Sequence, residues 1–466
     1  MLAMRAFKWT CAPTASEEVR QGSLERKDMP PARPQWLVLV TLTLAVTSFP
    51  AVAQVVTTTE QVGRGPDAVA VNANKVYVTN VCGDDPTCQS PGTVTVIDGT
   101  TRETVPIGFS GSSPHAVEVD SQANKIYVTN GCGTDFNCGS GGTVTVIDAN
   151  NNYATTTVPV GYSPSSVVVN STSHRIYVAN QCGSDSTCSS FGSLSVIDGP
   201  SNTVIATVPV QYFPESVALN PGTNKIYVAN NCGMDMTCST GTGTVSVING
   251  ASNTVTATPN VGFSPFRVNL NPATNKIYVS NNCGNDVTCN SPGTVSVIDG
   301  VSNTVIATVG VGAGPYGIAI NPTTNHIYVA NSCGNDSTCN NLGTGTVTDI
   351  DANNNNHPTT IPVGYGPQVL RVDAVHNKVY VANYCGNDPN CATPGTITLI
   401  DPTSNNSTFP VAVGDGPGPP AINSSTNTIY VPNYHDNTVS VIGGNTKLQF
   451  LRHCSLPSGG HPASEW

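Results

Sequence analysis

Paired cysteines are the residues of this sequence with the clearest capacity for chemistry. Seven pairs share the spacing C-x5-C and the longer pattern C-G-x-D-x-x-C. Two thiols at such a distance can form a disulfide, take part in binding a metal ion, or exchange electrons with a substrate. The pairs are Cys82/Cys88, Cys132/Cys138, Cys182/Cys188, Cys232/Cys238, Cys283/Cys289, Cys333/Cys339 and Cys385/Cys391. Cys11 and Cys454 lie outside the pattern.

Structural disulfides explain these pairs best. A zinc site needs four convergent ligands, usually with C-x2–4-C spacing, but each cysteine loop has two thiols and no recurring histidine. A dithiol oxidoreductase typically carries C-x-x-C beside a βαβ unit, and neither feature is present. We therefore predict seven local disulfides, each worth about 2 kcal/mol in the loop-entropy model. Metal binding and redox chemistry are the alternatives, and we expect neither a metal nor a cofactor.

One aspartate recurs inside each cysteine loop and allows two interpretations. The seven residues are Asp85, Asp135, Asp185, Asp235, Asp286, Asp336 and Asp388. Calcium prefers six to eight oxygen ligands at one site, so a single carboxylate per loop would suffice only if several loops converged. A short acidic side chain can also accept backbone N–H groups and fix a turn. The turn role is the simpler prediction.

The N-terminal region resembles an export signal. An apolar run at Trp36–Phe49 follows Arg33 and precedes a small-x-small pattern ending at Ala53. We expect residues 1–53 to be a leader and signal peptide, with Met29 as the true start or a genuinely long leader as the alternative. This predicts a secreted protein (periplasmic, extracellular or at the cell surface), where disulfides persist. Residues 445–466 break the pattern of the chain and are expected to form a disordered tail.

The composition argues against nucleic-acid binding. Residues 1–53 hold six Lys/Arg and four Asp/Glu, which leaves 12 basic and 25 acidic residues and a formal charge of −13 beyond Ala53. An acidic surface repels phosphate backbones. Beyond the leader, no apolar run is long enough to span a membrane. We expect a monomer with neither a nucleic-acid partner nor a membrane span.

A tetrapeptide repeat organises the rest of the chain. "YVTN" at Tyr77 returns as YVTN, YVAN, YVSN or YVPN at spacings of 50 to 52 residues. Each unit has four segments in which Val or Ile alternates with Thr or Ser, the period of β-strands, separated by Asn/Gly/Pro turns. Four strands per unit and a period near 50 predict a β-propeller. The repeats begin at Tyr77, Tyr127, Tyr177, Tyr227, Tyr278, Tyr328, Tyr380 and Tyr430.

The segment count predicts how the ring closes. Segments one, two and three occur eight times each, whereas segment four occurs seven times between them. An eighth copy, Val55–Val62, stands alone at the start of the repeat region, and the last unit ends on segment three at Gly444. We predict one all-β propeller domain over 54–444, with eight four-stranded blades closed by the N-terminal strand. A seven-bladed ring is the alternative.

The "YVTN" and "VSVID" segments, with the run "NPxTNKIYVAN", resemble the YVTN-type β-propeller repeat family. The resemblance covers roughly Gln54–Gly444 and rests on eight agreeing copies. It implies an extracytoplasmic propeller and no single activity. Repeats of that family are near 40 residues, and the excess here lies in the cysteine loop, which the eighth unit lacks.

Candidate binding residues lie where the repeats disagree. The residue after the loop proline differs in every unit: Asp67, His115, Ser165, Glu215, Phe266, Tyr316, Gln368 and Gly418. Nearby, four polar residues interrupt small or apolar positions of the first segment: Glu118, Arg267, Asn269 and Arg371. Simple solvent exposure is the alternative explanation for the first set, and simple charge satisfaction for the second. The predicted ligand-binding residues are His115, Glu118, Glu215, Phe266, Arg267, Tyr316 and Arg371.

Two functions fit these residues. One is a secreted, disulfide-stapled scaffold that binds a protein or cell-envelope polymer through its cysteine-loop face. The other is a propeller enzyme, such as a lyase, a lactonase or a quinone-dependent dehydrogenase, with its site at the channel mouth. No G-x-S-x-G, H-E-x-x-H or phosphate-loop motif occurs, so no catalytic residue is named and the binding scaffold is preferred.

Overall fold

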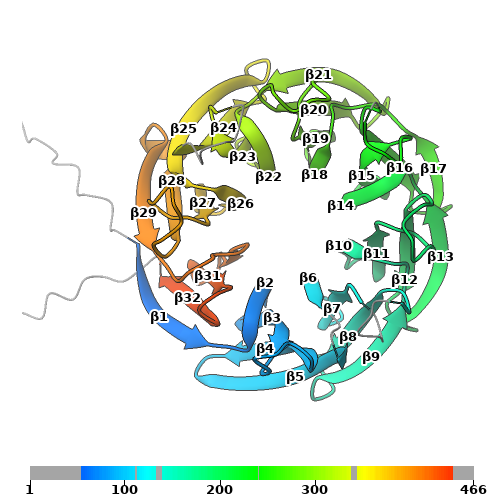
Figure 1. Ribbon diagram of the computed structural model, residues 1–466, viewed down its shortest axis with the longest axis vertical. Helices are drawn as coiled ribbons and strands as arrows, with labels where there is room; N and C mark the ends of the chain where they lie inside the picture. Colours follow the sequence, from blue (N-terminus) through cyan, green and yellow to red (C-terminus); the bar gives the residue numbers. More distant parts are fainter. Residues whose placement is uncertain (1–53, 111–112, 133–138, 240, 337–343, 444–466) are drawn as a thin grey trace, which may run out of the picture. The chain divides into compact units, whose positions relative to one another are not determined.

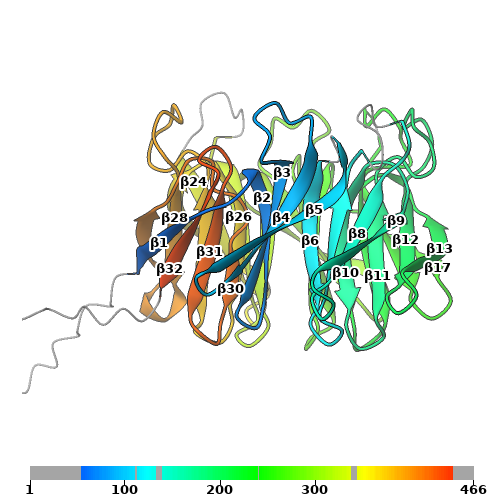
Figure 2. The ribbon, with the colours of Figure 1, turned by 90° about the horizontal axis from the view of Figure 1, so that it is seen from below.

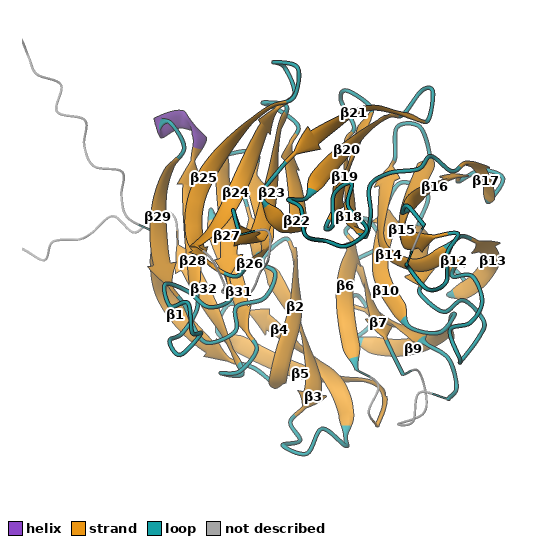
Figure 3. Ribbon diagram, turned by 45° about the horizontal axis from the view of Figure 1, so that its top comes forward, coloured by secondary structure: helices purple, strands orange, loops and turns teal. Residues whose placement is uncertain are grey.

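A computed structural model describes residues 54–110, 113–132, 139–239, 241–336 and 344–443. In this part of the chain, eight four-stranded antiparallel sheets are arranged around a central channel like the blades of a propeller (Figure 1). The predicted eight-bladed architecture is confirmed, and the seven-bladed alternative is wrong. Almost every ordered element is a strand (Figure 3); the exception within the described residues is a short 3-10 turn, η1 (Pro402–Ser404).

The strands follow the four segments of each repeat, with the first strand nearest the channel. Blade 1 contains β2 (Arg64–Asn72), β3 (Lys75–Gly83), β4 (Pro91–Asp98) and β5 (Thr101–Ser110). Blade 2 contains β6 (Pro114–Asp120), β7 (Lys125–Asn130), β8 (Thr143–Asp148) and β9 (Ala154–Pro159). Blade 3 contains β10 (Pro164–Asn170), β11 (Arg175–Asn180), β12 (Ser193–Asp198) and β13 (Thr203–Pro209). Blade 4 contains β14 (Tyr212–Asn220), β15 (Lys225–Gly233), β16 (Thr244–Asn249) and β17 (Thr254–Ala257).

The remaining blades repeat this order. Blade 5 contains β18 (Pro265–Asn271), β19 (Lys276–Asn281), β20 (Thr294–Asp299) and β21 (Thr304–Gly310). Blade 6 contains β22 (Ala313–Asn321), β23 (His326–Gly334), β24 (Thr344–Asp351) and β25 (His357–Tyr365). Blade 7 contains β26 (Pro367–Asp373), β27 (Lys378–Asn383), β28 (Thr396–Asp401) and β29 (Ser407–Ala412). Blade 8 contains β30 (Ala421–Asn423), β31 (Thr428–Asn433), β32 (Thr438–Gly443) and, from the other end of the chain, β1 (Val55–Gln61).

The ring closes through the N-terminal strand, as the segment count predicts. β1 pairs antiparallel with β32, from Val55 opposite Gly443 to Gln61 opposite Thr438. Beyond the pair, the Val62 amide donates to the Asn437 carbonyl at 3.1 Å. This pairing satisfies backbone groups of β32 that would otherwise form an open sheet edge.

The hydrophobic core lies between neighbouring blades. In one cluster, Tyr127 and Val146 of blade 2 pack with Val167 and Val178 of blade 3, and all four side chains are buried. Strands of this kind alternate their side chains between two faces, so each sheet presents apolar residues to the blade on either side. Burial of one such side chain contributes about 1.5–3 kcal/mol. The core is therefore a ring of inter-blade contacts.

The asparagine of each tetrapeptide fastens its blade internally. In blade 4, the fully buried Asn230 donates to the hydroxyls of Thr244 and Ser246 at 3.1 and 3.0 Å. Corresponding bonds occur in every blade, because the third strand carries Ser or Thr at both acceptor positions. The eight asparagines are Asn80, Asn130, Asn180, Asn230, Asn281, Asn331, Asn383 and Asn433.

A second set of polar bonds links adjacent blades at the far end of the inner strands. Asn72 donates to Asn124 of the next blade at 2.8 Å. The same asparagine pair occurs at three further blade junctions, with distances of 2.7 to 2.8 Å. Between blades 2 and 3 the pair is instead the fully buried Asp120 and the partly exposed His174, with His174 Nδ1 and Asp120 Oδ2 2.6 Å apart. The chain thus uses an ionisable pair at this junction, where four other junctions use a pair of neutral amides.

The expected leader at 1–53 lies outside the described residues. Gly444 and the expected tail at 445–466 lie outside them as well. Among the described residues, none of the helices has the length and apolar character needed to cross a membrane.

Candidate functional site

The cysteine loops carry disulfides. Five pairs are bonded, with Cα atoms 4.3 to 4.7 Å apart: Cys82–Cys88, Cys182–Cys188, Cys232–Cys238, Cys283–Cys289 and Cys385–Cys391. The other two predicted pairs each have a member, Cys138 or Cys339, outside the described residues. The five bonds confirm the disulfide prediction for these loops and favour an oxidising, extracytoplasmic location.

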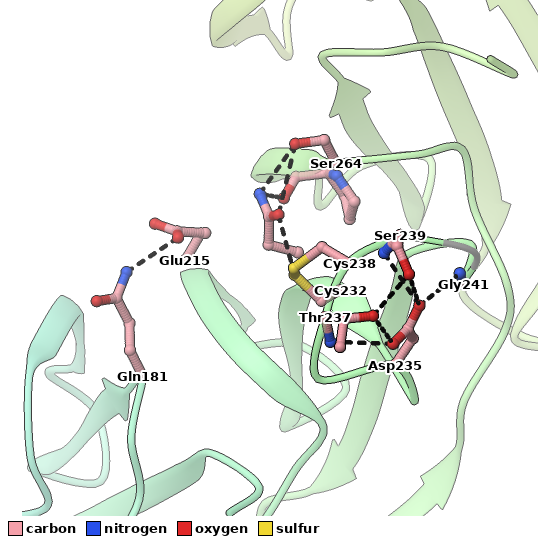
Figure 4. The surroundings of a disulfide bond; sticks show 11 residues. Gln181, Glu215, Cys232, Asp235, Thr237, Cys238, Ser239, Gly241 and Ser264 are labelled. Atoms are coloured by element: carbon pink, nitrogen blue, oxygen red, sulfur yellow. Dashed lines mark hydrogen bonds between the residues drawn. A yellow bond between two sulfur atoms is a disulfide. The ribbon is translucent and has the colours of Figure 1, made fainter. Parts of the chain in front are cut away.

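The loop aspartate fixes the turn that the disulfide closes. In blade 4, Asp235 accepts hydrogen bonds from the amides of Thr237 at 2.9 Å, Ser239 at 3.0 Å and Gly241 at 3.2 Å (Figure 4). The Thr237 hydroxyl donates a further bond at 2.7 Å. The same arrangement holds Asp185, where hydrogen bonds from Thr187 lower the pKa of the carboxyl to about 2. The carboxylate oxygens are thus engaged by their own loop.

Within the described residues, no group of three or more His, Cys, Asp or Glu side chains is placed to hold a metal ion.

The cysteine loops and the starts of the inner strands lie on one edge of the ring, which we call the mouth edge. Figure 2 shows the long loop between β3 and β4 on this edge and short hairpins on the opposite edge. The register explains the arrangement, because Arg64 at the start of β2 lies opposite Gly83 in the cysteine loop. Residues that begin the inner strands therefore surround the channel opening.

A glycine–proline contact sets the position of each inner strand. Gly92, which opens the third strand of blade 1, lies so close to Pro114 of blade 2 that an added Cβ would approach the proline Cδ to 2.6 Å. The contact recurs between the other blades in Gly142–Pro164, Gly192–Pro214, Gly243–Pro265, Gly293–Pro315, Gly345–Pro367 and Gly395–Pro417. The residue before each inner-strand proline also has a positive φ, as in Ser264 with 53°. Blades 1 to 7 thereby hold the first residues of the next inner strand at the channel.

The channel opening contains a cavity of about 810 Å3, which we call the mouth cavity. All eight residues that follow the loop prolines line it: Asp67, His115, Ser165, Glu215, Phe266, Tyr316, Gln368 and Gly418. Glu118, Arg267, Asn269 and Arg371 line it as well, so the structure brings every predicted binding residue to one place. A smaller hollow of about 450 Å3 beside β1 and β29 contains none of them.

Two oppositely charged residues that line the mouth cavity interact electrostatically. Glu118 lies on β6 and Arg371 on β26, and both side chains are open to the channel. Loss of hydration raises the pKa of Glu118 to about 7, and the positive charge of Arg371 partly opposes this shift. No carboxylate oxygen lies within 4.0 Å of the Arg371 guanidinium among the described residues, and its Nη1 donates only to the Leu370 carbonyl at 3.3 Å.

A second group surrounds Arg267 nearer the opening. Its guanidinium carbon lies 4.6 Å from the ring centre of Phe266 and 5.7 Å from that of Tyr316. The two rings are themselves 4.0 Å apart at 38°. Cation–π contacts of this kind hold a guanidinium while leaving its edge donors available. Glu215 lies within electrostatic range of Arg267, and Gln181 donates to its carboxylate at 2.9 Å (Figure 4).

His115 and Asp67 complete the charged groups of the mouth cavity. His115 Nδ1 lies 3.3 Å from Asp67 Oδ2, and both side chains are more than a third exposed. The cavity therefore combines guanidinium, carboxylate, imidazole and aromatic groups within one opening. Such a cavity can bind a polar ligand in one orientation, because the chemical groups on opposite sides of the cavity differ.

A second variable position was missed in the sequence. The residue directly after each tetrapeptide asparagine also changes from blade to blade, and four of these residues line the mouth cavity: Gly131, Gln181, Tyr384 and Tyr434. The same comparison among repeats that identified the post-proline positions would have found them. Their location follows from the register, since this residue leaves the second strand beside the start of the inner strand.

Comparison with solved structures identifies the same fold. A structure described as the Dos1 propeller matches with a TM-score of 0.61 and 12% identity, over 84% of this chain and 96% of that one. Hydrazine synthase from Kuenenia stuttgartiensis matches with a TM-score of 0.54 and 19% identity, over 74% and 98% of the two chains. No family model and no curated protein sequence matches this chain. At these identities the likeness shows a β-propeller fold and no particular activity.

Proposed function

We propose that this protein is a secreted ligand-binding propeller of the YVTN-repeat type, acting at the cell envelope or outside the cell. The observation that supports it is the mouth cavity, where eight dissimilar residues stand on eight similar blades. Frame positions are repeated because each must pack against the next blade. The mouth positions are free of that demand, and their variety creates an asymmetric surface suited to one ligand.

The disulfide loops support the same proposal. The described loops lie on the same edge of the ring as the cavity, and their disulfides add stability to loops that a binding surface would otherwise leave mobile. In this proposal, the cysteine-loop face meets a cell-envelope polymer or protein, and the channel takes up the part of the partner that provides specificity.

A binding screen with matched variants tests the proposal. Wild-type protein would be screened against cell-wall fragments, glycans and small metabolites, followed by affinity measurements on the double variant Phe266→Ser/Tyr316→Ser. Serine is the residue that blade 3 carries at this position, as Ser165. Val375→Ser, on an exposed hairpin of the opposite edge, is the control. We expect the mouth variant to lose the ligand and the control to keep it; equal binding by both variants would place the site elsewhere and overturn the proposal.

An enzyme with its site in the mouth cavity is the second candidate, favoured by one observation. A carboxyl group with a pKa near 7, such as that of Glu118, is suited to general acid–base catalysis at neutral pH. For an enzyme, Glu118→Gln would abolish turnover of the bound ligand while leaving its affinity nearly unchanged. Absence of turnover by the wild-type protein with every ligand found in the screen would exclude this candidate for those ligands.

A further inference from the structure

The positive charges of the described chain are almost all committed to structural partners. Seven of the ten Lys and Arg side chains bind carboxylates, amides or carbonyl groups of neighbouring segments. These are Lys75, Arg102, Lys125, Arg175, Lys225, Lys276 and Lys378. The other three are Arg64, which is exposed outside the mouth cavity, and the two cavity residues Arg267 and Arg371.

The two cavity arginines have donors without protein acceptors. Among the described residues, neither guanidinium has a carboxylate within 4.0 Å; Arg267 Nη1 reaches only the Glu215 carbonyl at 3.5 Å. Arg267 is half-buried and Arg371 is open to the channel, and the surrounding protein lowers the pKa of both groups by partial desolvation. An arginine remains charged under such conditions. A desolvated cation with free donors is costly, and a bound anion would relieve that cost.

The two glutamates of the cavity do not supply that anion, and Asp67 lies against His115. Burial raises the pKa of both Glu118 and Glu215, so each holds its negative charge less firmly than an exposed glutamate. Glu215 also already accepts a bond from Gln181. These groups are placed instead to accept hydrogen bonds from hydroxyls of a ligand.

The other lining residues describe the rest of the ligand. Gln181, Gln368 and Asn269 offer amide groups, and Phe266 and Tyr316 offer ring surface. Amides and carboxylates together recognise hydroxyls, aromatic faces pack on sugar rings, and arginine binds carboxylate with two parallel hydrogen bonds. A ligand that satisfies all three is a sugar ring with a carboxylate.

We propose that the mouth cavity binds a uronic acid, with its carboxylate at Arg267 and Arg371 and its hydroxyls at the amide and acidic side chains. This inference rests on the proposed binding function and names its ligand class. The uronic acid could arrive free or as the terminal unit of an acidic polysaccharide.

The eighth blade offers room for a longer chain. Its hairpin between Asn433 and Thr438 lacks a cysteine loop, so the mouth edge is lower there. Tyr384 and Tyr434, on either side of this gap, line the cavity, and Tyr434 is 38% exposed. Their rings would support further sugar units leaving the channel.

Calorimetric titration with matched sugars tests the ligand class. Galacturonate and galactose differ in the carboxylate that replaces the hydroxymethyl group, so their comparison isolates the charge. We expect wild-type protein to bind galacturonate at least tenfold more tightly than galactose. Trigalacturonate distinguishes the two sources, since tighter binding than the monomer indicates a polymer end and equal binding indicates a free acid. Triglutamate probes an acidic peptide as the competing ligand.

The repeat supplies variants that preserve the frame. Arg371→Ala introduces the residue that blades 1, 4 and 6 carry at this position, as Ala70, Ala218 and Ala319. Arg267→Ser introduces the residue of blades 3 and 4, Ser166 and Ser216. Each should weaken galacturonate binding at least tenfold. Arg64→Ala removes one positive charge outside the cavity and should leave the affinity unchanged.

The outcomes separate this inference from the proposed function. Three results would overturn the uronic-acid assignment. The first is equal affinity for galactose and galacturonate, and the second is unchanged binding by both arginine variants. The third is no galacturonate binding up to ~10 mM, an affinity weaker than typical recognition. Binding of triglutamate in preference to the sugars would also overturn it. In each of those cases the binding function survives if the wider screen finds another ligand that the Phe266→Ser/Tyr316→Ser variant loses.

Discussion

Replacing Gly243 by alanine should disturb both the frame and the site, because this glycine positions the start of β18. A Cβ added at Gly243 would overlap Cδ and Cγ of Pro265 and approach the Gly262 carbonyl oxygen to 3.0 Å. Neither neighbour can turn aside, since one is a rigid ring and the other is backbone. Pro265 is followed directly by Phe266 and Arg267, so a shift of the inner strand moves two residues of the mouth cavity.

The expected size follows from overpacking. Extra atoms in a tightly packed site cost about 1–3 kcal/mol, and the rigidity of Pro265 favours the upper value. With an unfolding entropy of about 2.1 cal/mol/K per residue, a domain of roughly 370 residues loses about 4 °C of melting temperature for 3 kcal/mol. Differential scanning calorimetry on purified, oxidised protein measures this shift.

Gly310→Ala is the matched control for Gly243→Ala. Gly310 ends β21, its φ is not positive, and nothing lies within 4 Å of an added Cβ. We expect its melting temperature to stay within about 1 °C of wild type or to rise slightly. If both alanine variants melt alike, the glycine–proline contact does not hold the blades in place. If Gly243→Ala is destabilised but binds the ligand as tightly as wild type, the contact does not position the mouth residues.

Four further predictions concern closure, stapling and protonation. Deleting 54–62 should lower the melting temperature and produce oligomers in light scattering, because β32 becomes an open edge; an unchanged monomer of equal stability would refute closure by β1. Cys232→Ser/Cys238→Ser should lower the free energy of unfolding by about 2 kcal/mol in denaturant titration. Alkylation of native protein should find at most one free thiol, at Cys454, and several reactive thiols would refute the structural disulfides. The hydrogen bonds of Asp120 with His174 and local amides lower the pKa of its carboxyl, although burial opposes this. The ionised Asp120 therefore stabilises the fold above the unfolded pKa near 4, and this contribution is lost as the pH falls through the lower folded value. The stability difference between wild type and Asp120→Asn should shrink in acid, and adding His174→Asn should restore stability by recreating the amide pair of other blades. Lowering the pH from 8 to 6 neutralises Glu118, whose pKa is about 7. This removes the negative charge that acts on Arg371, so galacturonate should bind more tightly. Glu118→Gln should remove most of that pH dependence, and a full dependence in the variant would contradict the role of Glu118.

The frame could be predicted from the sequence because eight copies report on the same structure. Alternating Val and Thr marked the strands, the tetrapeptide marked the register, and the unpaired segment at Val55–Val62 marked the closure. Each of these signals is local or repeated. The contact of Gly243 with Pro265 is equally regular, yet its cause became visible only when the two blades were placed side by side.

The site could be predicted in part. Comparing repeats identified the positions that face the channel, since positions free of packing differ from blade to blade. Charge pairing among Glu118, Arg267 and Arg371 was one explanation from the sequence, but it could not be predicted that Glu118 and Arg371, from distant blades, interact electrostatically without forming an ion pair. The shift in the pKa of Glu118 likewise depends on how the channel wall removes water, which no spacing in the sequence records.

Ring closure by β1 also places both ends of the described propeller on the same edge of the ring. The described ends, Val55 and Gly443, are paired with each other at the edge opposite the mouth edge. A tether, label or fused domain joined at either end is therefore attached on the far side from the cavity. The propeller can be displayed from a surface or a bead with its opening turned outward, and both ends serve equally well as the point of attachment.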